Sequence, residues 1–350
     1  MEGFGGAGNY GISRMNGGSS SRVLIGLAPA RPGSADVNPS AWWRRDVARL
    51  LEVRSGLTGK ALLWLEPWPE GDALALDGLD PLFIEVCRRV RLSEKTGGMS
   101  ARRSTSKAAR ISAKDAKGNV GDPWAPIHVG EGKALTLGER GDWTHKMLVK
   151  LQFAGNKREW KVPFLAEPTP EEETAPLLLV AEAFARGNSK TDGFRSRVVP
   201  VPKAVVKEFL GERPVSVADD LLKDIAAIDA ALRDALALVA SGGDPEKMGK
   251  QYYERAQPAR VALRRAADQM FFPELWRRVE AKADADFGRL RLGFLQALGD
   301  IARQEFRARC GDIPCASIMR PRAEVRGRDR LENRLRRAME PFKQPEDAHG

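Results

Sequence analysis

The chain has 350 residues, of which 42% are hydrophobic and 30% charged, so it can bury a core and is not disordered as a whole. Lys and Arg outnumber Asp and Glu by 57 to 47, and the formal net charge of +10 favours a polyanionic partner such as a nucleic acid. No apolar run reaches the roughly 18–20 residues of a membrane-spanning helix, which argues against a membrane partner.

Cysteine and histidine are rare and scattered, without the CxxC or HExxH spacing of a metal site. No Ser-His-Asp order and no paired carboxylates in an apolar setting indicate a catalytic centre. We therefore expect no enzyme activity, no cofactor and no metal ion, and a reducing, cytoplasmic environment. The cysteines are Cys87, Cys310 and Cys315, and the histidines are His128, His145 and His349.

The first segment is rich in glycine: residues 3–18 read GFGGAGNYGISRMNGG. It lacks the GxxxxGK[ST] of a phosphate loop, and no strand precedes it as a dinucleotide fingerprint requires. Two interpretations stay open. The segment is either a free N-terminal tail or a loop that lies against a nucleic-acid backbone or groove.

The following residues predict a mixture of short strands and helices. Apolar runs at 23–27 and 82–87 predict strands, and the spacing of apolar residues over 39–53 predicts a helix. Farther along, residues 177–184 predict a helix and 198–201 a strand.

Residues 93–118 are polar and strongly basic, with no apolar periodicity that would attach them to a core. We expect a mobile loop or a weak hairpin on the surface, which is either simply solvated or in contact with phosphates. The candidate residues for contact with a DNA backbone are Lys95, Arg102, Arg103, Lys107 and Arg110.

Two further segments are predicted to be connections. The Glu- and Pro-rich residues 167–173 predict an exposed connection. Residues 187–197 read GNSKTDGFRSR and lie between the predicted helix at 177–184 and the strand at 198–201. Loops presented by ordered elements often carry function, although a plain connection is the alternative.

Beyond residue 215 the apolar period becomes that of long helices. An S-x-x-D cap formed by Ser216 and Asp219 predicts the start of the first helix, and Gly242 and Gly243 predict its end.

Three more helices are predicted after that turn. Asp244 and Pro245 open the second, with a kink at Pro258. The third starts near residue 284, and the fourth near residue 322 presents Val325, Leu331, Leu335 and Met339 to the core. The arginines of the last helix indicate either an exposed, internally paired face or a binding groove.

The predicted fold class is α+β. A mixed α/β lobe with irregular loops spans residues 1–205, an antiparallel four-helix bundle spans 206–342, and 343–350 form a disordered tail.

The chain resembles the CasA large-subunit family of the type I-E CRISPR Cascade complex. The resemblance rests on the loop at residues 3–18, the stretch at 187–197, and the bundle with QYYERAQPARVALRRAADQMFFPELW in its second helix. It implies a subunit that recognises the short motif (PAM) beside a double-stranded DNA target, starts strand separation and R-loop formation, and helps recruit a helicase-nuclease. The implied partners are the target DNA, the guide-RNA-containing Cascade subunits and that helicase-nuclease.

The family's functional loops map onto two places in this sequence. The motif-reading glycine loop would comprise Gly5, Gly6, Gly8, Asn9 and Tyr10. The strand-separating wedge would comprise Asn188, Ser189, Lys190 and Thr191, with Lys190 where some members carry glutamine.

The sequence departs from the family in starting immediately before the glycine loop. We expect that the chain is a fragment or that another polypeptide supplies the preceding region. Two other functions stay open: a structural assembly subunit of a ribonucleoprotein without motif reading, and an unrecognised enzyme such as a nuclease.

Overall fold

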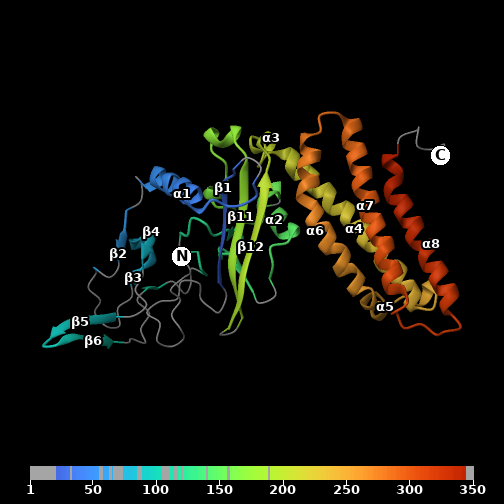
Figure 1. Cartoon of the computed structure of the whole chain (residues 1–350), viewed down its shortest axis with the longest axis horizontal. Helices are drawn as coiled ribbons and strands as arrows, with labels where there is room; N and C mark the ends of the chain where they lie inside the picture. Colours follow the sequence, from blue (N-terminus) through green and yellow to red (C-terminus); the bar gives the residue numbers. More distant parts are fainter. Residues whose placement is uncertain are drawn as a thin grey trace. The chain divides into compact units, whose positions relative to one another are not determined.

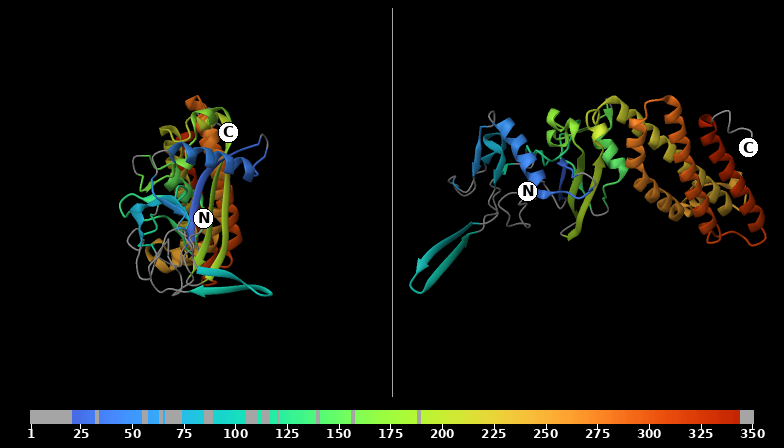
Figure 2. Two further views of the ribbon diagram at one scale, coloured as in Figure 1. Left: turned by 90° about the vertical axis from the view of Figure 1, so that its left-hand side faces the viewer. Right: turned by 45° about the horizontal axis from the view of Figure 1, so that its top comes forward.

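The computed structural model describes residues 21–31, 34–54, 58–62, 65, 74–84, 89–104, 111–112, 117–119, 121–138, 141–155, 158–187 and 190–343. They form two compact units. The first contains the described residues up to Trp143 together with Met147–Lys207, and the second contains Thr144–Lys146 and the residues from Glu208 onward. The first unit mixes strands and short helices, whereas the second is helical, which confirms the predicted α+β class (Figures 1 and 2).

A four-stranded antiparallel sheet is the centre of the first unit. Its order is β12 (Lys190–Val201), β11 (Leu177–Gly187), β1 (Ser21–Pro29) and β9 (Thr136–Leu137). Strand β1 confirms the strand predicted at 23–27. It pairs with β11 from Val23 opposite Ala183 to Pro29 opposite Leu177.

The helix predicted at 177–184 is wrong, because these residues form β11. Leu177–Ala181 are all buried, and the strand has a hydrogen-bonded neighbour on each side. A strand covered on both faces is apolar at every position, so it lacks the alternation that distinguishes a strand from a helix.

Helix α1 (Pro39–Arg54) confirms the predicted helix at 39–53 and covers one face of this sheet. Trp42 packs against Ala28, Leu178 and Val180. The Asn38 carboxamide oxygen accepts hydrogen bonds from the first backbone amides of the helix, at 3.2 Å from the Ser40 nitrogen and 3.4 Å from the Ala41 nitrogen. These bonds satisfy donors that would otherwise be free at a helix start.

The rest of the first unit consists of short elements. The strand predicted at 82–87 corresponds to β4, which ends at Ile84, and residues 85–87 lie outside the described residues. The short elements are β2 (Lys60–Leu62) with β4 (Leu79–Ile84), β3 (Leu74–Ala75) with β7 (Ile111–Ser112), β5 (Arg89–Lys95) with β6 (Gly98–Ser104), β8 (Ile127–His128) with β10 (Trp160–Lys161), α3 (Lys203–Val206) and the 3-10 turns η3 (Leu76–Gly78), η5 (Phe164–Ala166) and η6 (Pro170–Thr174). Helix α2 (His145–Gln152) belongs to the first unit from Met147 onward.

The second unit is the predicted four-helix bundle, made of α4 (Glu212–Ala240), α6 (Gln257–Glu280), α7 (Asp284–Cys310) and α8 (Arg320–Met339). Helix α4 contacts each of the other three. Gly327 lets α8 approach α4 closely, because a Cβ at this position would lie 2.6 Å from a methyl carbon of Val239. No helix within the described ranges is both long and apolar enough to cross a bilayer.

Helix boundaries in the bundle differ from the prediction at two places. Helix α4 starts at Glu212 after the N-cap Gly211, not at Ser216, and Pro214 lies in its first turn, where proline is tolerated. The second predicted helix is divided into η7 (Pro245–Lys247), α5 (Lys250–Arg255) and α6.

Proline explains the division. Pro258 occupies the first turn of α6 and does not kink a continuous helix, because proline has no amide to continue the hydrogen bonds of the preceding turn. Val325, which was predicted to face the core, is 53% exposed.

Candidate nucleic-acid interface

The residues predicted to contact nucleic acid are only partly described by the structure. Gly5, Gly6, Gly8, Asn9 and Tyr10 lie outside the described residues. The same holds for Asn188 and Ser189 of the wedge and for Lys107 and Arg110 of the basic segment. Their placement at an interface therefore stays a prediction.

The remaining wedge residues begin strand β12 at the end of the β11–β12 hairpin. Lys190 pairs with Gly187, and Thr191 pairs with Arg186. The segment predicted as a loop at 187–197 is therefore mostly strand. Strand β1 pairs with β11 only as far as Ala183, whereas β12 continues beside β11 to Gly187. The hairpin end is thus a two-stranded extension of the sheet.

The basic segment contains a second hairpin, formed by β5 and β6, and this hairpin was one of the two predicted alternatives. The Ser93 and Ser100 hydroxyl oxygens lie 2.8 Å apart across the two strands. Because side chains alternate along a strand, Lys95 and Arg102 share the face of this serine pair. Neither cation forms an ion pair with another described residue, so this face offers free positive charge.

The opposite face of the same hairpin is mixed, because the register places Glu94 and the predicted contact residue Arg103 on it beside apolar residues. Leu92 and Met99 are 60% and 67% exposed. Among the described strands, β5 and β6 pair only with each other, and Figure 2 shows them as a separate ribbon.

The arginines of α8 divide into paired and unpaired groups. Arg320 pairs with Glu324, Arg334 pairs with Asp234 of α4, and Arg326 donates to the Gly243 carbonyl oxygen at 2.7 Å. The exposed arginines with neither an ion pair nor a hydrogen bond to another described residue are Arg322, Arg328, Arg336 and Arg337. The interpretation as a paired face therefore applies to part of this helix, and the binding groove stays a prediction.

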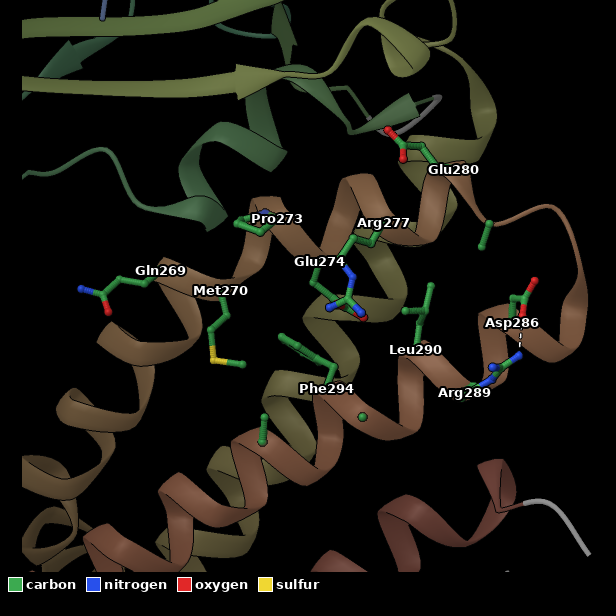
Figure 3. A pocket seen from close by; sticks show the side chains of 13 residues that line it. Gln269, Met270, Pro273, Glu274, Arg277, Glu280, Asp286, Arg289, Leu290 and Phe294 are labelled. Carbon is green, nitrogen blue, oxygen red and sulfur yellow. Dashed lines mark hydrogen bonds and ion pairs between the residues drawn. The ribbon is translucent and has the colours of Figure 1, made fainter. Parts of the chain in front are cut away.

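A groove of about 830 Å³ lies between α6 and α7. Figure 3 shows Met270, Leu290 and Phe294 pointing into it. Its rim carries both signs of charge, since Arg289 pairs with Asp286 at 2.5 Å and Glu280 also lines it. This groove therefore lacks the single-sign field that attracts a phosphate backbone.

Across the described ranges, no group of three or more His, Cys, Asp or Glu side chains is arranged to hold a metal ion. Burial raises the pKa of the Cys310 thiol to about 11. The thiol is thus protonated at neutral pH and is a poor nucleophile.

No protein-family model matches the chain, and no curated protein matches it in sequence. Several solved structures match the chain in fold. The structure of the CRISPR-associated protein Cse1 from Acidimicrobium ferrooxidans matches 92% of this chain with a TM-score of 0.55 at 17% identity. Thermus thermophilus CasA (Cse1) matches 95% with a TM-score of 0.55 at 16% identity. Another structure, of a CRISPR associated protein from Thermus thermophilus, matches 97% with a TM-score of 0.57 at 15% identity.

The chain therefore has the fold of CasA (Cse1) over most of its length, which confirms the predicted resemblance at the level of fold. It spans 65% of the Cse1 chain and 68% of each of the two Thermus chains.

Proposed function

We propose that the chain is a CasA-like large subunit of a CRISPR RNA-guided DNA surveillance complex and contacts double-stranded target DNA. The CasA (Cse1) fold supports this role, since the three solved proteins named above that share the fold are CRISPR-associated or CasA proteins. The observation that carries the proposal is the position of Lys190 at the end of a two-stranded extension of the central sheet.

The extension suits a wedge because it is only two strands wide and continues from the buried part of β11. Separating two base pairs costs a few kcal/mol of stacking, which protein contacts must offset. Lys190 supplies a cation at the hairpin end for the phosphates of a separated strand. Residues 188–191 would then start strand separation, and Gly5, Gly6, Gly8, Asn9 and Tyr10 would read the flanking motif.

The other proposed partners follow from the division of labour in RNA-guided systems, in which base pairing reads the target and protein reads a short motif. They are the guide-RNA-containing subunits and the helicase-nuclease that the complex recruits. In this role the chain binds and positions DNA in the cytoplasm and cleaves nothing itself.

Lys190→Ala tests the wedge. In the complex assembled with its partner subunits, we expect about tenfold weaker binding of an intact duplex target. The reason is that strand separation is no longer stabilised by the contact between Lys190 and a phosphate of the separated strand. The affinity for a target with a pre-opened bubble should fall by less than about twofold. Filter binding measures both substrates, and Lys161→Ala, at an exposed lysine of β10, is the matched control. Equal losses on both substrates would contradict the wedge.

Lys95→Ala with Arg102→Ala tests the β5–β6 hairpin as a phosphate-binding surface. Each phosphate contact contributes about 0.9 to the slope of log affinity against log salt concentration, so the double variant should lower the slope by about 1.8. The measurement is a salt series of duplex binding by the isolated chain. Arg102→Lys keeps the charge and should keep the slope. An unchanged slope in the double variant would leave the hairpin as a solvated surface.

A second candidate function is a structural assembly subunit whose bundle only docks on partner proteins. It is favoured by the ion pairs within the bundle, such as Arg334 with Asp234, which engage arginine side chains inside the protein. The two functions differ in one observable: the assembly subunit would bind duplex DNA neither at low nor at high salt.

A further inference from the structure

A tryptophan-rich pocket lies between helix α1 and the central sheet. It has a volume of about 520 Å³, which is within the range of small-ligand sites. Its wall comes from α1, from strands β1 and β11, and from the segment before β8. The lining residues are Leu24, Pro39, Ser40, Trp42, Trp43, Asp46, Trp124 and Glu182.

Glu182 of β11 is a carboxylate without a cationic partner among the described residues. Its one hydrogen bond to a described side chain comes from the Ser196 hydroxyl, at 3.4 Å. Burial raises the pKa of Glu182 above its ordinary value, and only the Ser196 hydrogen bond opposes this shift. Because a partly buried anion without a counterion is unfavourable, the pocket gains stability from a bound cation.

Asp46 of α1 is a second carboxylate in the wall, and it is buried and already bound. Its oxygens accept hydrogen bonds from the Trp124 indole nitrogen at 2.8 Å and from Arg45 at 3.2 Å. Burial raises the pKa of Asp46, while the bonds to Trp124 and Arg45 lower it. Asp46 therefore holds the Trp124 ring in place and adds acidic character to the pocket.

The indoles supply flat aromatic surface on more than one side. Trp43 is 62% exposed although the neighbouring Trp42 packs on the sheet core. The other two rings both lie beside Gly26 of β1, where a Cβ would be in ordinary van der Waals contact with Trp42 at 3.7 Å and with Trp124 at 3.9 Å. A large exposed indole beside a formed pocket is typical of a binding site.

We infer that this pocket binds an arginine side chain of a partner protein. A guanidinium is planar, stacks on indole faces and donates from its edge to a carboxylate, and these are the two kinds of group in the wall. The volume exceeds that of one guanidinium and admits the backbone of the segment that carries it. This inference goes beyond the proposed DNA contacts and does not depend on them.

The same features disfavour nucleic acid at this pocket. Two carboxylates repel a phosphate backbone. The start of α1 offers no free anion site either, because the Asn38 side chain already accepts from the Ser40 and Ala41 amides. The lining of the pocket contains these two carboxylates and no Lys or Arg.

The test uses the full chain labelled with 5-fluorotryptophan and followed by fluorine NMR. The probe is the peptide acetyl-Gly-Arg-Gly-amide, and its counterpart carries citrulline, which has the shape of arginine without the charge. We expect saturable shifts of the Trp43 and Trp124 resonances with the arginine peptide, and at least about fivefold weaker binding of the citrulline peptide. Trp43→Phe and Trp124→Phe assign the resonances.

Glu182→Gln should weaken binding of the arginine peptide by about fivefold and leave binding of the citrulline peptide unchanged, because the substitution removes only the negative charge. Glu254→Gln, at an exposed glutamate of α5, should change neither. Equal binding of the two peptides, no saturable shift up to about 20 mM peptide, or tighter binding of uridine monophosphate than of the arginine peptide would each overturn the inference.

Discussion

Arg278→Ala is expected to lower the free energy of unfolding of the helical bundle by about 3–5 kcal/mol. The Arg278 side chain is fully buried, and it donates to Glu274 at 2.9 Å and to Asp224 at 3.1 Å. Both carboxylates have side chains only 5% exposed. Removing the guanidinium leaves two buried anions without a full complement of partners, which is the main source of the expected loss.

The same cluster joins three helices of the bundle. Asp224 of α4 also accepts a hydrogen bond from Arg291 of α7, at 2.8 Å. The Arg278 guanidinium lies 5.1 Å from the centre of the Phe294 ring and 5.9 Å from that of Phe287, both on α7. Loss of Arg278 therefore weakens contacts of α6 with α4 and with α7 together.

Urea unfolding followed by circular dichroism measures the effect, and hydrogen exchange locates it. Arg277→Ala is the matched control, because Arg277 pairs with the same Glu274 but is 65% exposed. It should change stability by less than about 1 kcal/mol. If the Arg278 and Arg277 variants lost similar stability, the buried cluster would not have the role assigned to it.

A double variant separates charge from packing. Arg278→Met with Glu274→Leu removes one buried anion with its partner and leaves Asp224 bound to Arg291. Buried ion pairs are often replaceable by apolar residues of similar size, so the double variant should recover a large part of the loss.

The bundle could be predicted from sequence because its signal is local. Leu221, Ile225, Ile228 and Leu232 recur on one side of α4 and are all buried. Helix starts were harder to place, since the Ser216 cap motif is as good as Gly211 when only the sequence is considered. The buried Arg278 cluster has no signal in a single sequence, because charged residues on a helix ordinarily face solvent.

The sheet was predicted less well because its pairing is long-range. Residues 177–184 read as a helix until β1 and β12 are known to flank them. This error also concealed the tryptophan pocket. Glu182 faces the pocket only if β11 is a strand with Leu24 of β1 and Ser196 of β12 directly beside it.

The acidic segment at 167–173 was also predicted only in part. It was predicted to be an exposed connection, but Glu172 in the 3-10 turn η6 binds the buried Arg45 through both carboxylate oxygens. A Pro- and Glu-rich composition indicates a connection. It does not show which glutamate finds a buried partner on a helix far away in the sequence.

Arg45→Ala is expected to lower the free energy of unfolding of the first unit by about 2–4 kcal/mol. The Arg45 guanidinium donates to Glu172, to the Leu165 carbonyl oxygen at 2.8 Å, to the Glu167 carbonyl oxygen at 2.9 Å and to Asp46 at 3.2 Å. Its loss would leave these acceptors short of donors in a buried place. Arg45→Lys keeps the charge but cannot reproduce the planar fork, so it should recover only part of the stability.

Arg44→Ala is the control, because Arg44 is the exposed neighbour on the same helix. We propose that the two units unfold separately, so hydrogen exchange should show lost protection in β1 and β11 for the Arg45 variant and in α4 and α6 for the Arg278 variant. Loss of protection in both units from either variant would contradict separate unfolding.

Arg45→Ala also distinguishes a positioning role from direct binding at the tryptophan pocket. Arg45 holds Asp46 and so helps to fix Trp124, but it does not line the pocket. Arg45→Ala should therefore lower stability and weaken binding of both the arginine and the citrulline peptide, because the Trp124 side of the pocket is displaced. Glu182→Gln should weaken only the charged peptide and leave the unfolding transition nearly unchanged. If the two variants gave the same pattern, Glu182 would act through the fold and not through its charge.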